Sequence, residues 1–359
     1  MEHFCCKTRI LSGTGAIWKL SGLGIRKLLI VADPYFEKTD IPQTLTRAAG
    51  AEQTSFFYDI SPDPTVELAA RGTALVQSLQ PDTVIALGGG SAMDCAKAMV
   101  YFSGQNPRLI AIPTTSGSGS EVTDFAILTH KGVKHPLVDP SIAPEIAILD
   151  GNLLFTLPPS LIADAGFDIL AHAVEAYVAQ GAGAITDALA RDAFAAAFTA
   201  LPASYRGDTS VRQRIHVAAT MAGMAFSQAG LGLCHGMSHA LGARLHLPHG
   251  RLNAILLPAV MDANREANSK YAALSQGVGL GGSAELLAVR NLRNGLIKLR
   301  KDLNLPGTLR EAGADCRQLR QEKGQICEAV LADACCGSNP VPVSEKMVLQ
   351  VLEAVMGRD

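Results

Sequence analysis

The sequence has few aromatic residues and no excess of charge of one sign. Phe, Tyr and Trp make up 5% of the 359 residues, and 31 Lys and Arg stand against 33 Asp and Glu. A protein that follows a phosphate backbone needs clustered Lys and Arg, so nucleic acid is not an expected partner. No apolar run reaches the length of about 18 residues that a membrane span needs, so no membrane contact is expected.

Patterns of disulfides and of zinc thiolates are lacking as well. The eight cysteines include the adjacent pairs Cys5-Cys6 and Cys335-Cys336, and no Cys-x-x-Cys motif occurs. Adjacent cysteines rarely bridge one another, so we expect reduced thiols. The segment Met1 to Lys7 has neither the basic nor the apolar region of a secretory signal. Both observations predict a cytoplasmic protein.

Strand-like and helix-like segments alternate over the first 150 residues. Apolar runs of strand length lie at Lys27 to Ala32, Thr54 to Tyr58, Thr83 to Leu87, Leu109 to Ile112 and Ile146 to Leu149. Such alternation predicts a parallel, doubly wound sheet of the kind that binds dinucleotides.

The character of the chain changes after Leu157. Long Ala- and Leu-rich segments of helical period follow, at Leu161 to Val178, Ala184 to Leu201 and Ser210 to Ala229, and no convincing strand is found. We therefore expect an α/β domain over residues 1–157 and an all-helical domain over residues 158–359.

A glycine-rich loop follows the third expected strand. The run Thr83 to Leu87 continues into Gly88-Gly89-Gly90-Ser91, and a helix-like segment begins at Ala92. Glycines let backbone N–H groups approach a pyrophosphate at a helix N-terminus, where the helix dipole also favours anions. The alternative is a tight turn that needs glycine for its conformation alone. A literal Gly-x-Gly-x-x-Gly at 277–282 has no strand before it, so it does not predict a dinucleotide site.

A polar loop, Pro113 to Glu121, follows the next strand. Its hydroxyl groups, among them those of Thr114, Thr115 and Ser118, can donate to phosphate or ribose, although a flexible loop would look the same. Two such loops at successive strand ends favour a dinucleotide crevice.

Asp33 follows the strand at 27–32, where a carboxylate can accept from ribose hydroxyls and repel a 2′-phosphate. This favours NAD over NADP, and capping of a loop is the alternative role.

An aspartate and several histidines form a second group. Four of the nine histidines lie in one short stretch, at His235, His239, His246 and His249. Upstream, Asp168 and His172 are four residues apart in a helical pattern, so they share one helix face. A carboxylate in an apolar helix must be paired or bound to a metal. A hydrogen-bonded Asp168 and His172 pair is one interpretation. The whole group favours a divalent-metal site with carboxylate and imidazole ligands, which suits Fe(II) or Zn(II).

Four separated motifs together resemble the iron-containing (group III) alcohol dehydrogenases. They are Gly88-Gly89-Gly90-Ser91-x-x-Asp94-x-x-Lys97, the loop Pro113 to Thr123, Asp168-x₃-His172-Ala173-x-Glu175-Ala176-Tyr177, and Gly232-x-x-His235-x₃-His239-x₉-His249-Gly250. The likeness runs in order along nearly the whole chain, from Leu11-Ser12-Gly13 to Ser338-Asn339-Pro340. It implies the dehydroquinate synthase-like fold of that family.

The resemblance implies a ligand set and a proton-handling residue. The metal ligands would be Asp168, His172, His235 and His249. Fe(II) is the expected metal and Zn(II) the alternative. His239 matches a histidine near the nicotinamide and the reacting alcohol, so it is the expected catalytic residue, and His246 has no family role.

The resemblance also implies contacts to NAD. Gly88 to Gly90 and Ser91 would hold the pyrophosphate, and Asp94 would support their loop. Thr114 and Ser118 would flank the cofactor, with Ser118 keeping the hydroxyl that many members supply from Thr.

Further family positions concern the ribose groups and the substrate. Lys134 would contact one ribose of NAD, and Asp33 would face the adenosine ribose. Phe226 matches an aromatic wall of the substrate pocket. Phe226 and Phe125 argue for an apolar substrate and against a polyol dehydrogenase such as glycerol dehydrogenase.

Segment 222–233 and the compact length resemble the 1-propanol and ethanol dehydrogenases of bacterial microcompartments. This implies reduction of propanal or acetaldehyde, which regenerates NAD beside an acyl-CoA-forming aldehyde dehydrogenase and shell proteins. Met1 to Ile10 could be a shell-targeting element, but we expect a first strand there. A homo-oligomer such as a dimer is also expected.

Two other functions compete with this prediction. A cyclase like dehydroquinate synthase would need a phosphate-binding pocket of several Lys and Arg in the helical domain, and we find no such pocket near these histidines. A catalytically idle, shell-associated scaffold would have lost at least one ligand, yet all four are present. The sequence therefore predicts a metal-dependent, NAD-linked alcohol dehydrogenase.

Overall fold

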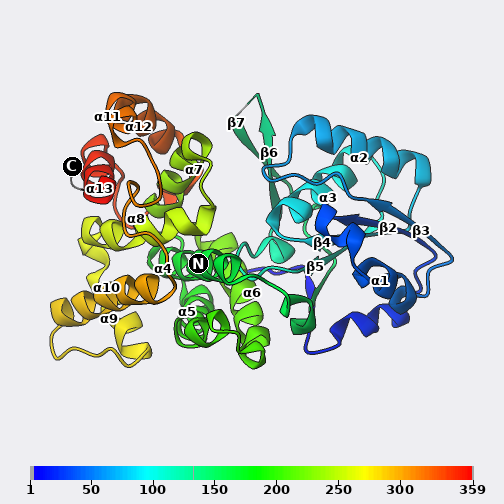
Figure 1. Cartoon of the computed structure of the whole chain (residues 1–359), viewed down its shortest axis with the longest axis horizontal. Coiled ribbons are helices and arrows are strands. Elements are labelled where there is room, and N and C mark those ends of the chain that lie inside the picture. Colours follow the sequence, from blue (N-terminus) through cyan, green and yellow to red (C-terminus); the bar gives the residue numbers. More distant parts are fainter. Residues whose placement is uncertain (1–3, 132, 358–359) are drawn as a thin grey trace. The chain divides into compact units, whose positions relative to one another are not determined.

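The computed structural model describes residues 4–131 and 133–357, which divide into two compact units (Figure 1). One unit spans Cys5–Thr156, and the other comprises Phe4 and the chain from Leu157 onward. Strands occur in the first unit, and the described part of the second unit is helical. The predicted combination of an α/β region followed by a helical region is confirmed.

The first unit is built on a six-stranded sheet in which all neighbouring strands are parallel. The strand order is β1-β8-β5-β4-β2-β3. The strands are β1 (Arg9–Ser12), β2 (Lys27–Ala32), β3 (Gln53–Phe57), β4 (Thr83–Gly88), β5 (Arg108–Pro113) and β8 (Ile146–Leu149). The five expected apolar runs correspond to β2, β3, β4, β5 and β8, with ends that differ by at most one residue.

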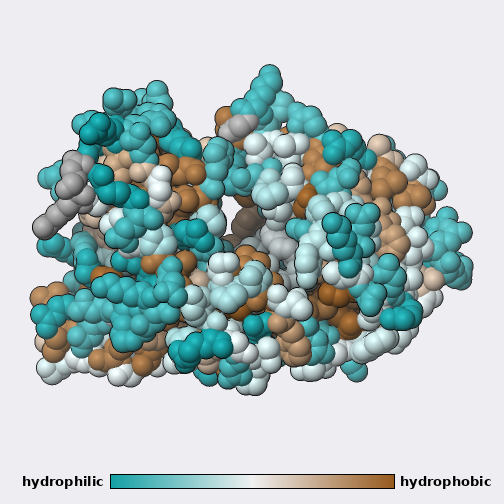
Figure 2. Space-filling view, in the orientation of Figure 1, coloured by the Kyte–Doolittle hydropathy of each residue, from teal (hydrophilic) through white to brown (hydrophobic). Residues whose placement is uncertain are grey.

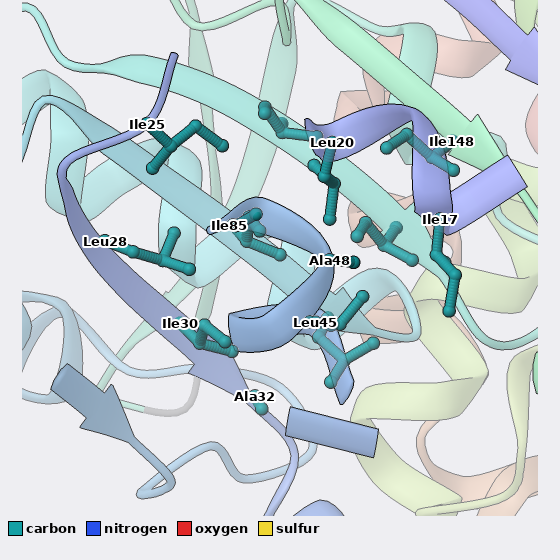
Figure 3. Close-up of a cluster of buried hydrophobic side chains, with 14 of the residues drawn as sticks. Ile17, Leu20, Ile25, Leu28, Ile30, Ala32, Leu45, Ala48, Ile85 and Ile148 are labelled. Atoms are coloured by element: carbon teal, nitrogen blue, oxygen red, sulfur yellow. The ribbon is translucent and has the colours of Figure 1, made fainter. Parts of the chain in front are cut away.

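Different elements cover the two faces of this sheet. These elements are η1 (Ala16–Gly22), η2 (Pro34–Lys38), α1 (Ile41–Ala49), α2 (Val66–Leu79) and α3 (Gly90–Ser103). On one face, Leu28 and Ile30 of β2 pack with η1 and with Leu45 of α1 (Figure 3). On the other face, Leu29 and Val31 pack with α2 and α3. Side chains alternate along a strand, and both faces are buried, which is why β2 reads as an unbroken apolar run.

An antiparallel hairpin, β6 (Phe125–His130) and β7 (Val133–Val138), was not expected from the sequence. Its residues are mostly half-buried or exposed, and β7 contains Pro136, which is unusual in a strand interior. The apolar runs that mark the main sheet are therefore lacking. The hairpin packs on α3, where Asp94 accepts a hydrogen bond from the Ile127 N–H at 3.0 Å.

The first strand lies later in the chain than expected and overlaps the predicted segment only at Arg9 and Ile10. Met1–His3 lie outside the described residues, and β1 begins only at Arg9. β1 lies at one edge of the sheet and pairs with β8. Short 3-10 turns, η3 (Ser120–Val122) and η4 (Gly151–Leu154), complete this unit.

The second unit contains ten helices and three short 3-10 turns among its described residues. The helices are α4 (Pro159–Val178), α5 (Ala184–Tyr205), α6 (Arg212–Ala229), α7 (Leu233–Leu245), α8 (His249–Ala263), α9 (Asn268–Gly277), α10 (Glu285–Asp302), α11 (Cys316–Gln321), α12 (Lys323–Ala332) and α13 (Glu345–Met356). The turns are η5 (Thr209–Val211), η6 (Arg265–Ala267) and η7 (Ala334–Ser338). The segment 277–282 links α9 to α10 with no strand before it, so it lacks the strand–turn–helix context of a dinucleotide fingerprint.

Helix α4 is the central helix of this unit. It packs against α5, α6, α7, α8 and α9. From Ile162 to Val178 only Ala165 is not buried, so neighbouring elements enclose this part of the helix on all sides. Polar residues on α4 must therefore find their partners inside the unit.

Among the described residues, no single helix is long and apolar enough to cross a membrane. Two consecutive helical segments, Thr209–Ala229 and Leu233–Leu245, reach the required length and apolar composition only when they are taken together, and the chain bends by 104° between them. Hydrophilic and hydrophobic residues are interspersed on the face shown in Figure 2. All eight cysteines are free thiols.

Candidate metal centre and cofactor loops

One stripe of helix α4 carries four ionisable side chains: Asp164, Asp168, His172 and Glu175. Residues three or four apart share a helix face, so these side chains point in one direction. All four are buried, with exposures of 7%, 8%, 5% and 3%. Buried charges need partners, and those partners come from α7 and α8.

Three helices bring three of the four predicted metal ligands together. His235 lies in the first turn of α7, and His249 is the first residue of α8. The Nε2 atoms of His235 and His249 lie 4.0 and 3.7 Å from Oδ1 of Asp168. Ligand atoms of these three residues all lie within 4.8 Å of one another. The donor set of one carboxylate and two imidazoles fits a divalent transition metal.

His172, the fourth predicted ligand, borders this group through its ring. Its imidazole stacks on that of His235, with centroids 4.5 Å apart. It also stacks on the ring of Phe226, with the two ring centroids 4.4 Å apart. Phe226, predicted to wall the substrate pocket, is thus packed against a predicted ligand.

Glu175 holds His235 in place, a role that the sequence analysis did not assign. Its Oε2 lies 2.6 Å from Nδ1 of His235. It also accepts from the N–H groups of Gly232, Cys234 and His235, which lie at the N-terminus of α7 and have no partner within the helix. With Nδ1 donating to Glu175, Nε2 is left to bind a metal. Burial raises the pKa of Glu175 to about 7.

Asn253 on α8 fixes the orientation of Asp168. It is fully buried, and its Nδ2 donates to Oδ1 of Asp168 at 2.8 Å. Its side-chain carbonyl oxygen, Oδ1, accepts a hydrogen bond from the hydroxyl of Ser238. An amide at this position is visible only in the tertiary structure, because nothing in the sequence pattern separates Asn253 from other polar helix residues.

Helices α4 and α8 approach each other closely beside these ligands. Arg251 forms two hydrogen bonds with Asp164, at 3.1 and 2.9 Å. A side chain at Gly250 would meet the backbone carbonyl of Asp164, so only glycine fits between His249 and this ion pair. The ion pair and the glycine together set the position of His249 relative to α4.

The surroundings of His235 and His249 favour the neutral form of both imidazoles. Burial lowers the pKa of His235 and of His249 well below the ordinary value. A neutral imidazole is the form that coordinates a metal. The protein interior thus favours the form in which these side chains can coordinate a metal.

His239 lies one turn after His235 on α7 and is paired differently. Its Nδ1 is 2.8 Å from Oδ2 of Asp333, and its ring stacks on that of His249 with centroids 5.2 Å apart. Although burial raises the pKa of Asp333, hydrogen bonds from His239 and Cys335 hold it at about 2. Asp333 lies 94 residues from His239, so no local pattern could have revealed the pair. His246, which has no assigned role, ends α7 with a positive φ of 52°.

The two predicted cofactor loops lie side by side in the α/β unit. The Thr114 N–H donates to the carbonyl of Gly88 at 2.9 Å. A Cβ at Gly88, where φ is 151°, would lie 2.7 Å from Cβ of Ala92, and one at Gly90 would lie 3.3 Å from Ser118. A Cβ at Gly89 would likewise come within 3.2 Å of Thr115. The loop therefore requires glycine for space, as a backbone cradle for phosphate does.

The position of these loops in the sheet matches that of known cofactor crevices. Strand β2 has β3 on one side and β4 on the other, so the strand order reverses between β2 and β4. Ligands of open α/β sheets bind at the carboxyl ends of strands beside such a reversal. Asp33 follows β2 there, and Gly88 ends β4.

Three other predicted cofactor residues have partners within the unit. Asp33 accepts from the Tyr35 N–H at 3.0 Å, so it does cap a loop. Lys134 on β7 is ion-paired with Asp63 at 2.7 Å. Burial raises the pKa of Asp94, which supports the hairpin, to about 6. Their contacts with a cofactor stay predictions, as does the contact of Ser91.

Lys97 is a buried cation whose role the sequence analysis did not assign. Its Nζ donates to the carbonyl and hydroxyl of Thr123, both at 2.9 Å, and to the carbonyl of Phe125 at 2.8 Å. Burial lowers its pKa to about 8. Lys97 therefore ties α3 to the segment that follows the polar loop. Phe125 packs near this amine, 5.9 Å from the ring centroid, and its place in a substrate pocket stays a prediction.

Comparison with known proteins gives a consistent result for both parts of the chain. Residues 7–151 match the family described as iron-containing alcohol dehydrogenase, and residues 162–356 match the C-terminal region of the Fe-containing alcohol dehydrogenase family.

Individual relatives agree over the full length. The chain is 38% identical to 1-propanol dehydrogenase PduQ of Salmonella typhimurium, covering 99% of this chain and 100% of that protein. It is 35% identical to the NADPH-dependent butanol dehydrogenase of Clostridium saccharobutylicum, over 99% and 98%. The structure of an iron-containing alcohol dehydrogenase from Thermococcus thioreducens superposes with a TM-score of 0.91 at 32% identity, covering 99% and 100% of the chains.

Proposed function

The chain belongs to the iron-containing alcohol dehydrogenase family, and on that premise we propose that it interconverts short-chain primary alcohols and aldehydes with NAD(H). Propanal and acetaldehyde are the proposed substrates in the reducing direction. Relatives named for propanol and butanol support this size class. The observation that carries the proposal is the convergence of Asp168, His235 and His249 from three helices, with every ligand atom within 4.8 Å of the others.

The residues that would hold the metal are Asp168, His172, His235 and His249. When bound, the metal supplies Lewis-acid chemistry at the alcohol oxygen. Glu175 and Asn253 keep His235 and Asp168 oriented toward the ion by the hydrogen bonds described above. Fe(II) is the proposed metal on the family name, and Zn(II) suits the same donors.

His239 is the proposed proton carrier. It is 31% exposed, whereas His235 is 1% exposed, so His239 can exchange protons with solvent. Asp333 accepts from Nδ1 and leaves Nε2 to receive or deliver a proton. The same arrangement of a carboxylate behind an imidazole orients histidines in other enzymes.

NAD would bind at the loops of the α/β unit. Gly88 to Gly90 and Ser91 would hold the pyrophosphate at the N-terminus of α3, and Thr114, Thr115 and Ser118 would line the neighbouring loop. The Asp33 carboxylate supports NAD over NADP by its charge. A relative of 35% identity is named for NADPH, so this preference needs its own measurement.

The proposal extends to the cellular setting. The likeness of segment 222–233 to microcompartment dehydrogenases supports a cytoplasmic enzyme that works beside an acyl-CoA-forming aldehyde dehydrogenase inside a protein shell. A homo-oligomer, such as a dimer formed through strand pairing or helical faces, is proposed as well. Size measurement of the purified enzyme, and co-purification with shell proteins, test these two points separately.

The decisive experiment uses metal-stripped protein that is reloaded anaerobically with a stoichiometric amount of Fe(II) or Zn(II). Consumption of NADH, and of NADPH in parallel, is followed with propanal and acetaldehyde. We expect metal-dependent turnover with both aldehydes and a preference for NADH. A folded protein that binds metal stoichiometrically but consumes neither cofactor would contradict the proposal and favour a polyol substrate, a cyclase or an idle scaffold.

A further inference from the structure

A second cluster of metal-binding donors lies beside the metal centre described above. It consists of His239 on α7, Asp333 just before η7, and Cys335 within η7. One ligand atom from each residue lies within 4.8 Å of the other two. The three side chains are half-buried, so an ion can reach them from solvent. Unlike the centre on α4, this cluster contains a thiol.

The donor types of this cluster suit a thiophilic divalent cation. Zinc takes imidazole, carboxylate and thiolate ligands in tetrahedral sites, with bonds of about 2.0–2.3 Å that place donor atoms roughly 3.5 Å apart. The pair His239 Nδ1 and Asp333 Oδ2, at 2.8 Å, needs to open only slightly to admit an ion. Three protein ligands leave one position for water.

We propose that His239, Asp333 and Cys335 form a second cation site, selective for thiophilic ions such as Zn²⁺, whose occupation inhibits the enzyme. Binding releases the proton of the Cys335 thiol, while the Nδ1 proton of neutral His239 is replaced by a proton on Nε2, so that Nδ1 can coordinate the ion. His239 then becomes a metal ligand and no longer exchanges protons with solvent. The inhibitory effect rests on the proposed role of His239, whereas the binding site itself does not.

Cobalt(II) distinguishes the two sites by the chemistry of their ligands. The centre of Asp168, His172, His235 and His249 contains no sulfur, so the first equivalent of Co²⁺ should show only weak d–d absorption. A second equivalent should add an intense thiolate-to-cobalt charge-transfer band in the near ultraviolet. This readout is independent of activity, so its failure is separable from failure of the proposed function.

The adjacent cysteines provide a matched pair of variants. Cys335→Ser should abolish the charge-transfer band, whereas Cys336→Ser, which changes the neighbouring thiol outside the cluster, should keep it. Absence of the band in the unaltered protein, or its survival in Cys335→Ser, would overturn the proposed site.

Inhibition is tested on iron-loaded enzyme with rising Zn²⁺. We expect loss of turnover with iron still bound, reversal by a chelator, and at least tenfold weaker inhibition of Cys335→Ser than of Cys336→Ser. Equal inhibition of both variants, or release of iron in step with the loss of turnover, would place zinc at the resident centre and contradict the inhibitory role.

Discussion

In the α/β unit the candidate site is made of backbone and small side chains, whereas in the helical unit it is made of large ionisable side chains. Gly88 and Gly90 have neighbours where a Cβ would lie. Asp168 and His235, by contrast, are oriented by the side chains of Asn253 and Glu175. At the first site, the space available for a side chain restricts which residues fit. At the second site, charge and hydrogen bonding restrict them.

The two sites use different local structure for a physical reason. Backbone N–H groups point outward only where a helix begins or a loop turns, so the phosphate cradle follows a strand end. Buried carboxylates and imidazoles cost free energy unless each is paired, so the metal centre needs helices that supply a second set of polar partners. Substitutions should therefore fail for different reasons in the two units.

The largest expected effect concerns the charged site. His249→Ala removes one of the converging ligands, so metal content and activity should be lost together, with turnover falling at least about a thousandfold because Lewis-acid stabilisation contributes several kcal/mol. Metal analysis beside rate measurement checks this. His239→Ala is the control, since it should keep the metal and slow turnover by about 10²–10⁴-fold. A His249→Ala enzyme without metal but with full activity would contradict the ligand assignment.

A smaller effect is expected at the backbone site. Gly88→Ala places a Cβ 2.7 Å from Ala92 at a φ of +151°, so the loop must shift. Such strain costs about 1–3 kcal/mol, which predicts a rise of about tenfold or more in KM for NADH with unchanged metal content. Gly22→Ala is the matched control, because a Cβ there meets nothing within 4 Å. An unchanged KM in Gly88→Ala would show that this loop does not hold the cofactor.

The last effect concerns the stability of the α/β unit. Burial lowers the pKa of Lys97 from 10.5 to about 8 in the folded protein, so the unfolded chain binds more protons between these pH values. The free energy of unfolding of the wild type should therefore rise with pH over that window, relative to Lys97→Met, by a few kcal/mol at most. Urea unfolding at several pH values measures the difference. Lys19→Met, which removes an exposed amine, is the control: its free energy of unfolding should differ from that of the wild type by the same amount at each pH in this window. If the difference between the wild type and Lys97→Met is also independent of pH, the role of burial is contradicted.

Much of the fold could be predicted because its signals are local. The strands β2, β4 and β8 are apolar runs with turn residues at their ends, and α4 to α6 have helical period and abundant Ala. The hairpin of β6 and β7 escaped prediction because it is stabilised by contacts with α3, including the Asp94 hydrogen bond, and by no apolar pattern of its own.

The candidate site divides in the same way. Asp168 and His172, and likewise His235 and His239, are recognisable because a spacing of four residues gives one helix face. Glu175 lies in the same motif as His172, and its position three residues later on the same helix face is a local signal for a role at this site. Asn253 and Asp333 gave no such signal, because their partners are 85 and 94 residues away.

The sequence by itself determined which segments form strands and helices, where glycine is needed, and which side chains can bind a metal. These properties depend on neighbours a few residues apart, through backbone conformation and periodicity. The tertiary structure decided how those side chains are oriented and ionised: Glu175 fixes the free nitrogen of His235, Asp333 that of His239, and burial shifts the pKa of Lys97. Hydrogen bonding and desolvation depend on what lies around a group in space, and only packing between distant segments sets that environment.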